Sequence, residues 1–352
     1  MGGIKMSNSL AVQRVLIYYD DESARRATVI RQLLTNRLTT SSRFWGMCYG
    51  LLDIVNTDYE LGMNLEKVSD LAADKGWLEK DSDSAYLLTP FGKKVRDDYL
   101  SLHKKLKKPE LFAKYSYRKF SALVTLCVQV ASELSFGNRS YVPITTDYHL
   151  LQIFKAWYLA YGKAGAAEVR IDLEKFLKEE DETDAAVFMS RFAGHETPGR
   201  TKEQIAADYE LEISDVVITE RDLTIRFSEF VINEGGCLAE LFKYEANEGL
   251  VSSSALKTYE MVCQGKSLKD VANLRRLKDS TVIEHLLDCA IVFDEFPFER
   301  FVSSAKKTRI EEVYAGQKTV CWDFHKLEGT GISFYEYRLV QIERIKENGS
   351  AY

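Results

Sequence analysis

The 352-residue sequence is poor in proline and histidine, with five of each. It also has no apolar run near the roughly 18 to 20 residues that a membrane-spanning helix needs, so no membrane span is expected. The start, MGGIKMSNSL, lacks the apolar core and cleavage site of a signal peptide, and Met6 is an alternative initiator. With 45% hydrophobic and 28% charged residues, the chain is predicted to be a globular protein of two or three domains.

Cysteine is sparse and shows no pairing pattern. None of the six cysteines stands at CxxC or another metal-ligand spacing, and each lies among apolar residues, as a reduced thiol in a protein core does. A cytoplasmic location is therefore predicted, with no metal and no other cofactor. The cysteines are Cys48, Cys127, Cys237, Cys263, Cys289 and Cys321.

Signatures of common enzymes are also absent. The sequence has no GxxxxGK[ST] phosphate loop, no GxSxG nucleophile motif, no HExxH zinc motif and no GxGxxG after a predicted strand. Acidic clusters such as the one at residues 179–184 lie in polar surroundings rather than in an apolar pocket. We therefore predict that the protein is not an enzyme and has no small-molecule substrate.

Charge is unevenly distributed along the chain. The net charge of −6 has the wrong sign for a protein that depends on nucleic-acid affinity alone. Residues 91–120 nevertheless hold ten Lys and Arg against three Asp and Glu, whereas residues 165–250 hold nine against twenty-one. This segregation fits one surface for phosphates and another for a protein partner, or else two solvated helix surfaces.

The most informative stretch, residues 254–291, reads as three short helices separated by two breaks. Gly265 ends the first helical pattern, since glycine readily adopts the positive φ found past a helix end. Ser267 and Asp270 predict the N-cap of the second helix, whose buried edge would be Val271, Ala272 and Leu274. A third helix is expected to start near Asp279.

Two short helices joined by a tight turn are the plan of a helix-turn-helix unit. In that plan the second helix, here Asp279 to Ala290, enters the DNA major groove by its N-terminal residues, which would project outward. The basic residues of the preceding turn would then lie near phosphates. The predicted DNA-binding residues are Lys266, Lys269, Arg275, Arg276, Lys278, Ser280, Thr281, Glu284 and His285. A unit that only packs against protein remains the alternative.

The stretch QGKSLKDVANLRRLKDSTVIEHLLDCAI, followed by FPFERFVSSAKKTRIEEVYA and ISFYEYRLVQIERIK, resembles the helix-turn-helix unit at the C-terminus of some RecQ-type DNA helicases. In length and order of segments the whole chain resembles the YpbB family of Gram-positive bacteria. That family carries the unit without a helicase motor and is encoded beside a RecQ-like helicase. The resemblance implies a role in helicase-linked DNA replication or repair, and it brings no catalytic residues.

The remaining sequence predicts a mainly α fold. In residues 1–108, strands at 77–80 and 85–89 with the pattern Leu88-Thr89-x-x-Gly92 resemble the wing of a winged-helix domain. Residues 109–250 predict an acidic helical middle, and within it Thr201 and Gln204 open a second helix-turn-helix-like unit whose next helix is capped by Ser214. That unit carries too much negative charge to approach phosphates. Residues 251–352 form the predicted C-terminal helix-turn-helix domain.

Three functions fit these features. The first is a non-enzymatic DNA-binding accessory protein that works with a RecQ-family helicase, the partner implied by the resemblance. The second is a sequence-specific transcription regulator that uses the same helix. The third is a protein adaptor whose helix-turn-helix units do not touch DNA.

Overall fold

The computed structural model describes residues 8–57, 64–81, 85–246 and 249–348. Over these ranges the chain forms sixteen α-helices and one three-stranded sheet, so the predicted mainly α fold is confirmed. No helix within them has both the length and the apolar character to cross a bilayer. By their contacts the residues group into two compact units, Met1–Arg14 with Lys94–Asn247 and Val15–Lys93 with Glu248–Tyr352.

The domain boundaries at residues 108 and 250 remain predictions. The two compact units are defined by contacts between residues, and such contacts do not show which parts of the chain fold on their own. The helix α5 (Pro90–Leu102) begins in the second unit and continues in the first. The helix α1 (Asn8–Val15) belongs to the first unit up to Arg14.

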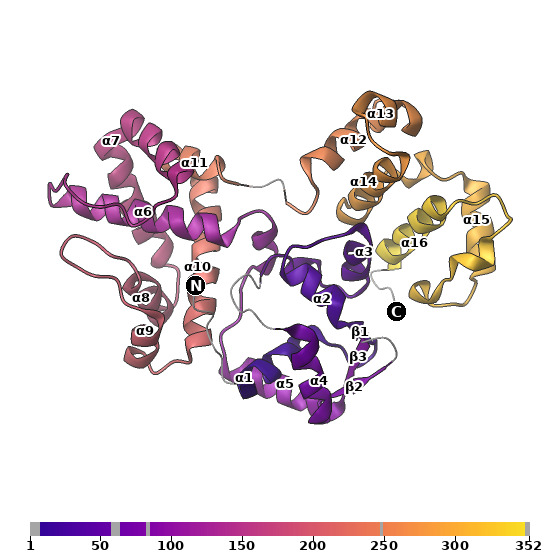
Figure 1. The fold of residues 1–352 in the computed structure, drawn as a ribbon, viewed down its shortest axis with the longest axis horizontal. Coiled ribbons are helices and arrows are strands. Elements are labelled where there is room, and N and C mark those ends of the chain that lie inside the picture. Colours follow the sequence, from indigo (N-terminus) through magenta and orange to yellow (C-terminus); the bar gives the residue numbers. More distant parts are fainter. Residues whose placement is uncertain (1–7, 58–63, 82–84, 247–248, 349–352) are drawn as a thin grey trace. The chain divides into compact units, whose positions relative to one another are not determined.

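The first unit is organised around α10 (Ile213–Glu234), in which every residue from Ser214 to Ile225 is buried. This helix packs against its neighbours on several sides (Figure 1). They are α6 (Tyr117–Ser135), α7 (Tyr148–Leu177), α8 (Glu182–Ser190), α9 (Lys202–Asp208), α11 (Gly236–Lys243) and the 3-10 helix η3 (Pro109–Ala113). Aromatic side chains from α6, α7, α10 and α11, including Phe120, Trp157 and Phe242, fill the core between them.

The second helix-turn-helix-like unit is α9 followed by α10. Its capping box is confirmed: the Thr201 hydroxyl accepts a hydrogen bond from the backbone N–H of Gln204, whose side chain accepts one from the N–H of Thr201. The next helix begins at Ile213 with Glu212 at its N-cap, so the cap expected at Ser214 is wrong. Because α10 is buried along most of its length, it forms the centre of this compact unit's core and is not accessible as a recognition helix.

The basic and acidic segments of the first unit pair with each other. Asp215, for example, lies 2.9 Å from the Nδ1 of His103 and is only 4% exposed. These pairs show that the two segments contact each other rather than lying on two separate faces. Four lysines within residues 103–119, together with His103, lie next to acidic side chains of the same unit. The pairs are His103–Asp215 at 2.9 Å, Lys104–Asp184 at 2.7 Å, Lys107–Glu180 at 3.1 Å, Lys108–Glu229 at 3.0 Å and Lys119–Glu245 at 2.8 Å.

Asp172 on α7 is a buried carboxyl whose Oδ2 atom has no hydrogen-bond partner within the described residues. Burial, with Glu168 and Glu234 nearby, raises its pKa to about 6. The folded state therefore binds more protons than the unfolded state between about pH 4 and pH 6, and stability falls as pH rises through that window. We expect Asp172→Asn to raise the free energy of unfolding at pH 7 by about 1 kcal/mol. Urea unfolding at pH 7 and pH 4.5 tests this, and an equal gain at both values would contradict it.

The second unit opens with a small sheet and three helices. Strand β1 (Arg25–Arg26) pairs with β3 (Ala85–Leu88), which pairs with β2 (Leu78–Lys80), all antiparallel. The helices α2 (Ala27–Leu34), α3 (Thr40–Cys48) and α4 (Leu65–Asp74) lie between β1 and β2 in the chain. The predicted β2–β3 hairpin is confirmed, while the acidic tip at residues 82–84 lies outside the described residues.

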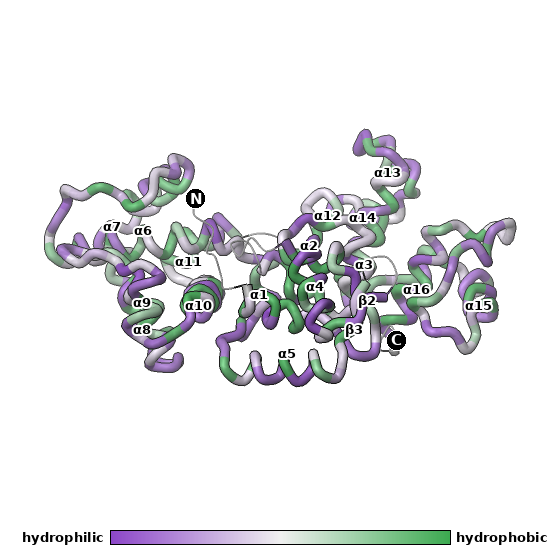
Figure 2. Tube along the Cα trace, turned by 60° about the horizontal axis from the view of Figure 1, so that its bottom comes forward, coloured by the Kyte–Doolittle hydropathy of each residue, from purple (hydrophilic) through white to green (hydrophobic). Residues whose placement is uncertain are grey.

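Within the described residues, the C-terminal part of the second unit contains five α-helices and three short 3-10 helices, with α14 at its centre. Helix α14 packs against α12, α13 and α16, and also against α3 from the N-terminal part of the same unit. Figure 2 colours the chain by hydropathy, so the hydrophobic stretches of α14 and of the neighbouring helices appear in green. The five helices are α12 (Ser253–Cys263), α13 (Leu268–Arg275), α14 (Asp279–Val292), α15 (Ser304–Val313) and α16 (Phe334–Asn348).

Candidate nucleic-acid interface

Local signals in residues 253–292 set the helix ends as predicted. Gly265 adopts φ 93° after α12. The Ser267 hydroxyl accepts a hydrogen bond from the backbone N–H of Asp270 at 3.1 Å, which caps α13. Arg276 then takes a left-handed conformation, and α14 starts at Asp279 after Lys278. The predicted pair of short helices with a tight turn is therefore present.

The packing of α14 divides it into a buried end and an accessible end. Residues 286–291 are all buried, where α3, α12 and α16 pack. At the other end Asp279 and Ser280 are exposed and Thr281 is half-buried. A small core of Val271, Ala272 and Val282 holds α13 against α14. The first turn of α14 is thus fixed in position and open to solvent.

Positive side chains lie at both ends of α13, and two of them, Arg276 and Lys278, directly precede this turn. Lys266, Lys269, Arg276 and Lys278 are all exposed, and none makes an ion pair within the described part of the chain. Residues 266–285 carry five basic and three acidic side chains, a local excess of +2 in a chain of net charge −6. The acidic Asp279 and Glu284 are also exposed, so the field around the turn is mixed.

Two of the nine predicted residues are used inside the protein. The guanidinium of Arg275 donates hydrogen bonds to the carbonyl oxygen of Ser254 at 2.5 Å and to the hydroxyl of Thr258. The same hydroxyl lies 2.8 Å from the Nδ1 of His285, which is half-buried rather than projecting outward as expected. Burial and the nearby Arg275 lower the pKa of His285, which keeps the ring neutral at pH 7.

Arg275 is therefore a brace between α12 and α13. We expect Arg275→Ala to lower the free energy of unfolding by about 1–3 kcal/mol, because it leaves the buried Thr258 hydroxyl without a charged donor. The exposed neighbour gives the control: Arg276→Ala should change stability by less than about 0.5 kcal/mol. Urea unfolding of both variants measures the contrast, and equal losses would contradict the assigned roles.

Arg276 has a backbone conformation that is costly for its residue type. Its φ of 54° and ψ of 44° lie in the left-handed region, which costs a non-glycine residue roughly 1 kcal/mol. Glycine or asparagine would adopt this conformation more easily. Glu210 has the same φ of 54° in the turn between α9 and α10, so this conformation belongs to the turn rather than to the arginine side chain.

One packing expectation for α13 is wrong. Leu274, predicted on its buried edge, is 63% exposed. The buried edge consists of Val271 and Ala272 alone, and Arg275 folds across the side that faces α12. Sequence periodicity missed this because leucine was assumed to face the core. Thr258 was also missed, since nothing in its local sequence marks it as the shared partner of Arg275 and His285.

The wing of the N-terminal part offers fewer free positive charges. Lys80 on β2 pairs with Asp70 at 3.0 Å, and the Tyr86 hydroxyl donates to the same carboxylate. Lys93 pairs with Asp21 at 2.5 Å. Lys80 and Lys93 are thus paired within the protein, unlike Arg276 and Lys278 beside α14.

Other kinds of site are less well supported. Within the described residues no group of three His, Cys, Asp or Glu side chains is placed to hold a metal ion. A hollow of about 640 Å³ lies beside the start of α13 and is bordered by Lys266, Arg300 and Tyr335. Its described lining contains no carboxylate and no histidine.

Comparison with known proteins supports the helix-turn-helix assignment. Residues 254–341 match a family of helix-turn-helix domains. The chain is also 25% identical over 199 residues to Protein YpbB of Bacillus subtilis (strain 168). That match covers 56% of this chain and 56% of the relative, so it spans about half the length of each. No solved structure matches the chain.

Proposed function

We propose that the C-terminal helix-turn-helix unit binds DNA through the first turn of α14 and the basic residues next to it. The proposal rests on one observation: the second half of α14 is buried, while its first turn is exposed beside Arg276 and Lys278. A rigid helix with an open N-terminal end is what major-groove recognition requires. The match of residues 254–341 to helix-turn-helix domains supports the same function.

The exposed residues divide into two groups by the contact that each side chain offers. Lys266, Lys269, Arg276 and Lys278 carry charges suited to phosphates, which position a protein on DNA. Ser280 and Glu284 lie on the exposed side of α14, where they are suited to base edges. Arg275 and His285 are left out of the contact set because they hydrogen-bond within the protein.

We further propose a cellular role for this DNA binding. The protein would be a non-enzymatic accessory that acts with a RecQ-family helicase in DNA replication or repair, in the cytoplasm. The helicase link depends on the family resemblance of the sequence. An accessory of this kind needs little sequence preference, whereas a transcription regulator needs a tight preferred site.

Fluorescence anisotropy with duplex, forked and single-stranded DNA tests the DNA-binding proposal. The variant Lys269→Ala/Arg276→Ala/Lys278→Ala is compared with Lys155→Ala/Lys243→Ala, which removes exposed lysines of the first unit. We expect a loss of affinity in the first variant only, at similar stability. Equal affinity of both variants would favour the adaptor function, and one preferred site in a random duplex library would favour the regulator.

The helicase partnership has its own test. A tagged chain expressed at its native level should co-purify with a RecQ-family helicase after nuclease treatment, which removes DNA that bridges two proteins. A helicase absent from the purified complex, or lost after nuclease treatment, would contradict a direct partnership while leaving DNA binding intact.

A further inference from the structure

A groove of about 830 Å³ runs between α6 and the second half of α7 in the first unit, with α8 at one end. Apolar side chains of α6, α7 and α8 line it, together with Ser132 and Ser135 of α6. Most of its exposed lining area is apolar. The main apolar lining residues are Val128, Leu134, Val169, Leu173, Leu177 and Met189.

Positive charge borders this groove at regular intervals. Lys163, Arg170 and Lys178 line it from α7, and all three are exposed. The only acidic lining residue is Glu174, whose carboxylate lies 3.7 Å from the Arg170 guanidinium. Neither Lys163 nor Lys178 has an ion pair within the described residues, so the border carries an uncompensated positive charge.

The spacing of these charges indicates the shape of the occupant. Lys163, Arg170 and Lys178 are separated by seven and eight residues, or about two helical turns each, and together span roughly 22 Å. A single small carboxylic acid cannot reach three cations spread over that length. A helix lying along α7 presents acidic side chains at the same interval of two turns, and its apolar face would cover the floor.

We propose that this groove binds an amphipathic helix with acidic flanks from a partner protein. The partner helix would lie along α7, with its apolar side chains against the groove floor and its carboxylates near Lys163, Arg170 and Lys178. Met189, which is 37% exposed on α8, is flexible enough to adjust to such a surface. The lining of this groove includes no residue of α13 or α14.

A synthetic peptide of about 18 residues, long enough to span the groove as a helix, provides the probe. It carries a leucine stripe flanked by glutamates, and a second peptide carries the same stripe flanked by lysines. The full chain should bind the glutamate peptide more tightly in a fluorescence anisotropy titration. No binding of the glutamate peptide, or equal binding of both peptides, would overturn the proposal.

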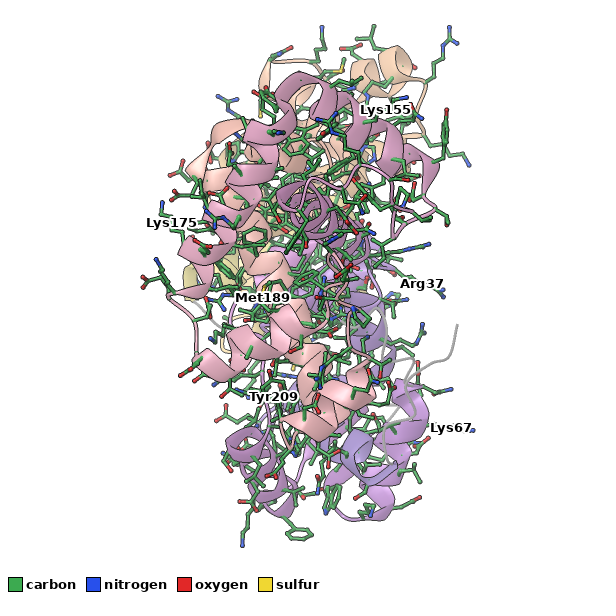
Figure 3. The ribbon with its side chains drawn as sticks, turned by 90° about the vertical axis from the view of Figure 1, so that its left-hand side faces the viewer. Arg37, Lys67, Lys155, Lys175, Met189 and Tyr209 are labelled. Atoms are coloured by element: carbon green, nitrogen blue, oxygen red, sulfur yellow. The ribbon has the colours of Figure 1, made fainter. Side chains whose placement is uncertain are left out.

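Reversing the charge of two groove lysines then tests whether the glutamate peptide binds in the groove. Lys163→Glu/Lys178→Glu is expected to weaken binding of the glutamate peptide about tenfold, because two attractions become repulsions. The matched control is Lys155→Glu/Lys243→Glu, which makes the same charge change away from the groove; Figure 3 shows Lys155 well apart from Met189. The control should change affinity less than twofold, and DNA affinity should remain the same in the groove variant relative to this control.

Two further outcomes would overturn the proposal. A dimer of the unmodified chain in sedimentation, lost in Lys163→Glu/Lys178→Glu, would assign the groove to a second copy of this protein. Displacement of the peptide by dodecanoate at a lower concentration than the unlabelled peptide requires would assign it to a small apolar acid.

Discussion

Replacing Arg43 with methionine is expected to lower the free energy of unfolding by about 3–5 kcal/mol, because the carboxylate of Asp288 would remain buried without its partner. The two side chains form an ion pair at 2.8 Å and are only 13% and 11% exposed. Arg43 also donates a hydrogen bond to the carbonyl oxygen of Leu250 at 3.2 Å. This one residue of α3 therefore contacts both α14 and the segment that precedes α12.

The effect of Arg43→Met should depend on pH. Burial raises the pKa of Asp288, while Arg43 and a hydrogen bond from Thr40 oppose that rise. Removal of Arg43 raises this pKa further, so the folded variant takes up a proton at a pH where the unfolded chain does not. The stability deficit of the variant should then be smaller at pH 5 than at pH 7.

Urea unfolding at both pH values measures this difference. The double variant Arg43→Met/Asp288→Leu is the control, since it removes both charges and should recover part of the loss at pH 7. A loss below about 1 kcal/mol in the single variant would contradict a buried, structurally important pair.

Gly92→Ala is expected to be similarly damaging, with a loss of about 3 kcal/mol or more. A Cβ atom on Gly92 would lie 1.9 Å from the backbone oxygen of Trp77 and 2.8 Å from its carbonyl carbon. The obstacle is backbone rather than a flexible side chain, so the start of α5 would have to move away from the end of the hairpin.

Thr89 explains why the two segments approach so closely. Its backbone N–H donates to the carbonyl oxygen of Trp77 at 3.1 Å, and its hydroxyl accepts from the N–H of Gly92 at 2.9 Å. Thermal unfolding of Gly92→Ala measures the loss, with Phe91→Ala, an exposed neighbour, as the control. A variant as stable as the unmodified chain would show that α5 can shift without loss.

Helix ends in the candidate interface could be predicted because their causes are local. A serine with an aspartate three residues later caps α13, and a glycine at positive φ follows α12. Such signals act within four residues and need no knowledge of the fold. For the same reason the β2–β3 hairpin and the capping box at Thr201 were predictable.

The roles of individual charged residues were not predictable, because they depend on contacts between distant segments. Arg275 and Arg276 are adjacent and chemically alike, yet the first is bound to Ser254 and the second is free of ion pairs in the described structure. Likewise, the basic residues near Lys107 and the acidic residues near Glu180 pair across 73 positions of sequence. Composition revealed both charge blocks but not that they face each other.

The salt dependence of DNA affinity tests the central claim most directly. For a nonspecific duplex, log Kd is measured against log salt concentration for the full chain and for Lys269→Ala/Arg276→Ala/Lys278→Ala. Each lost phosphate contact lowers the slope by about 0.9 on B-form DNA, so the variant's slope should be smaller by about 2–3. An unchanged slope in the variant, with normal stability, would contradict a DNA-binding role for the exposed end of α14.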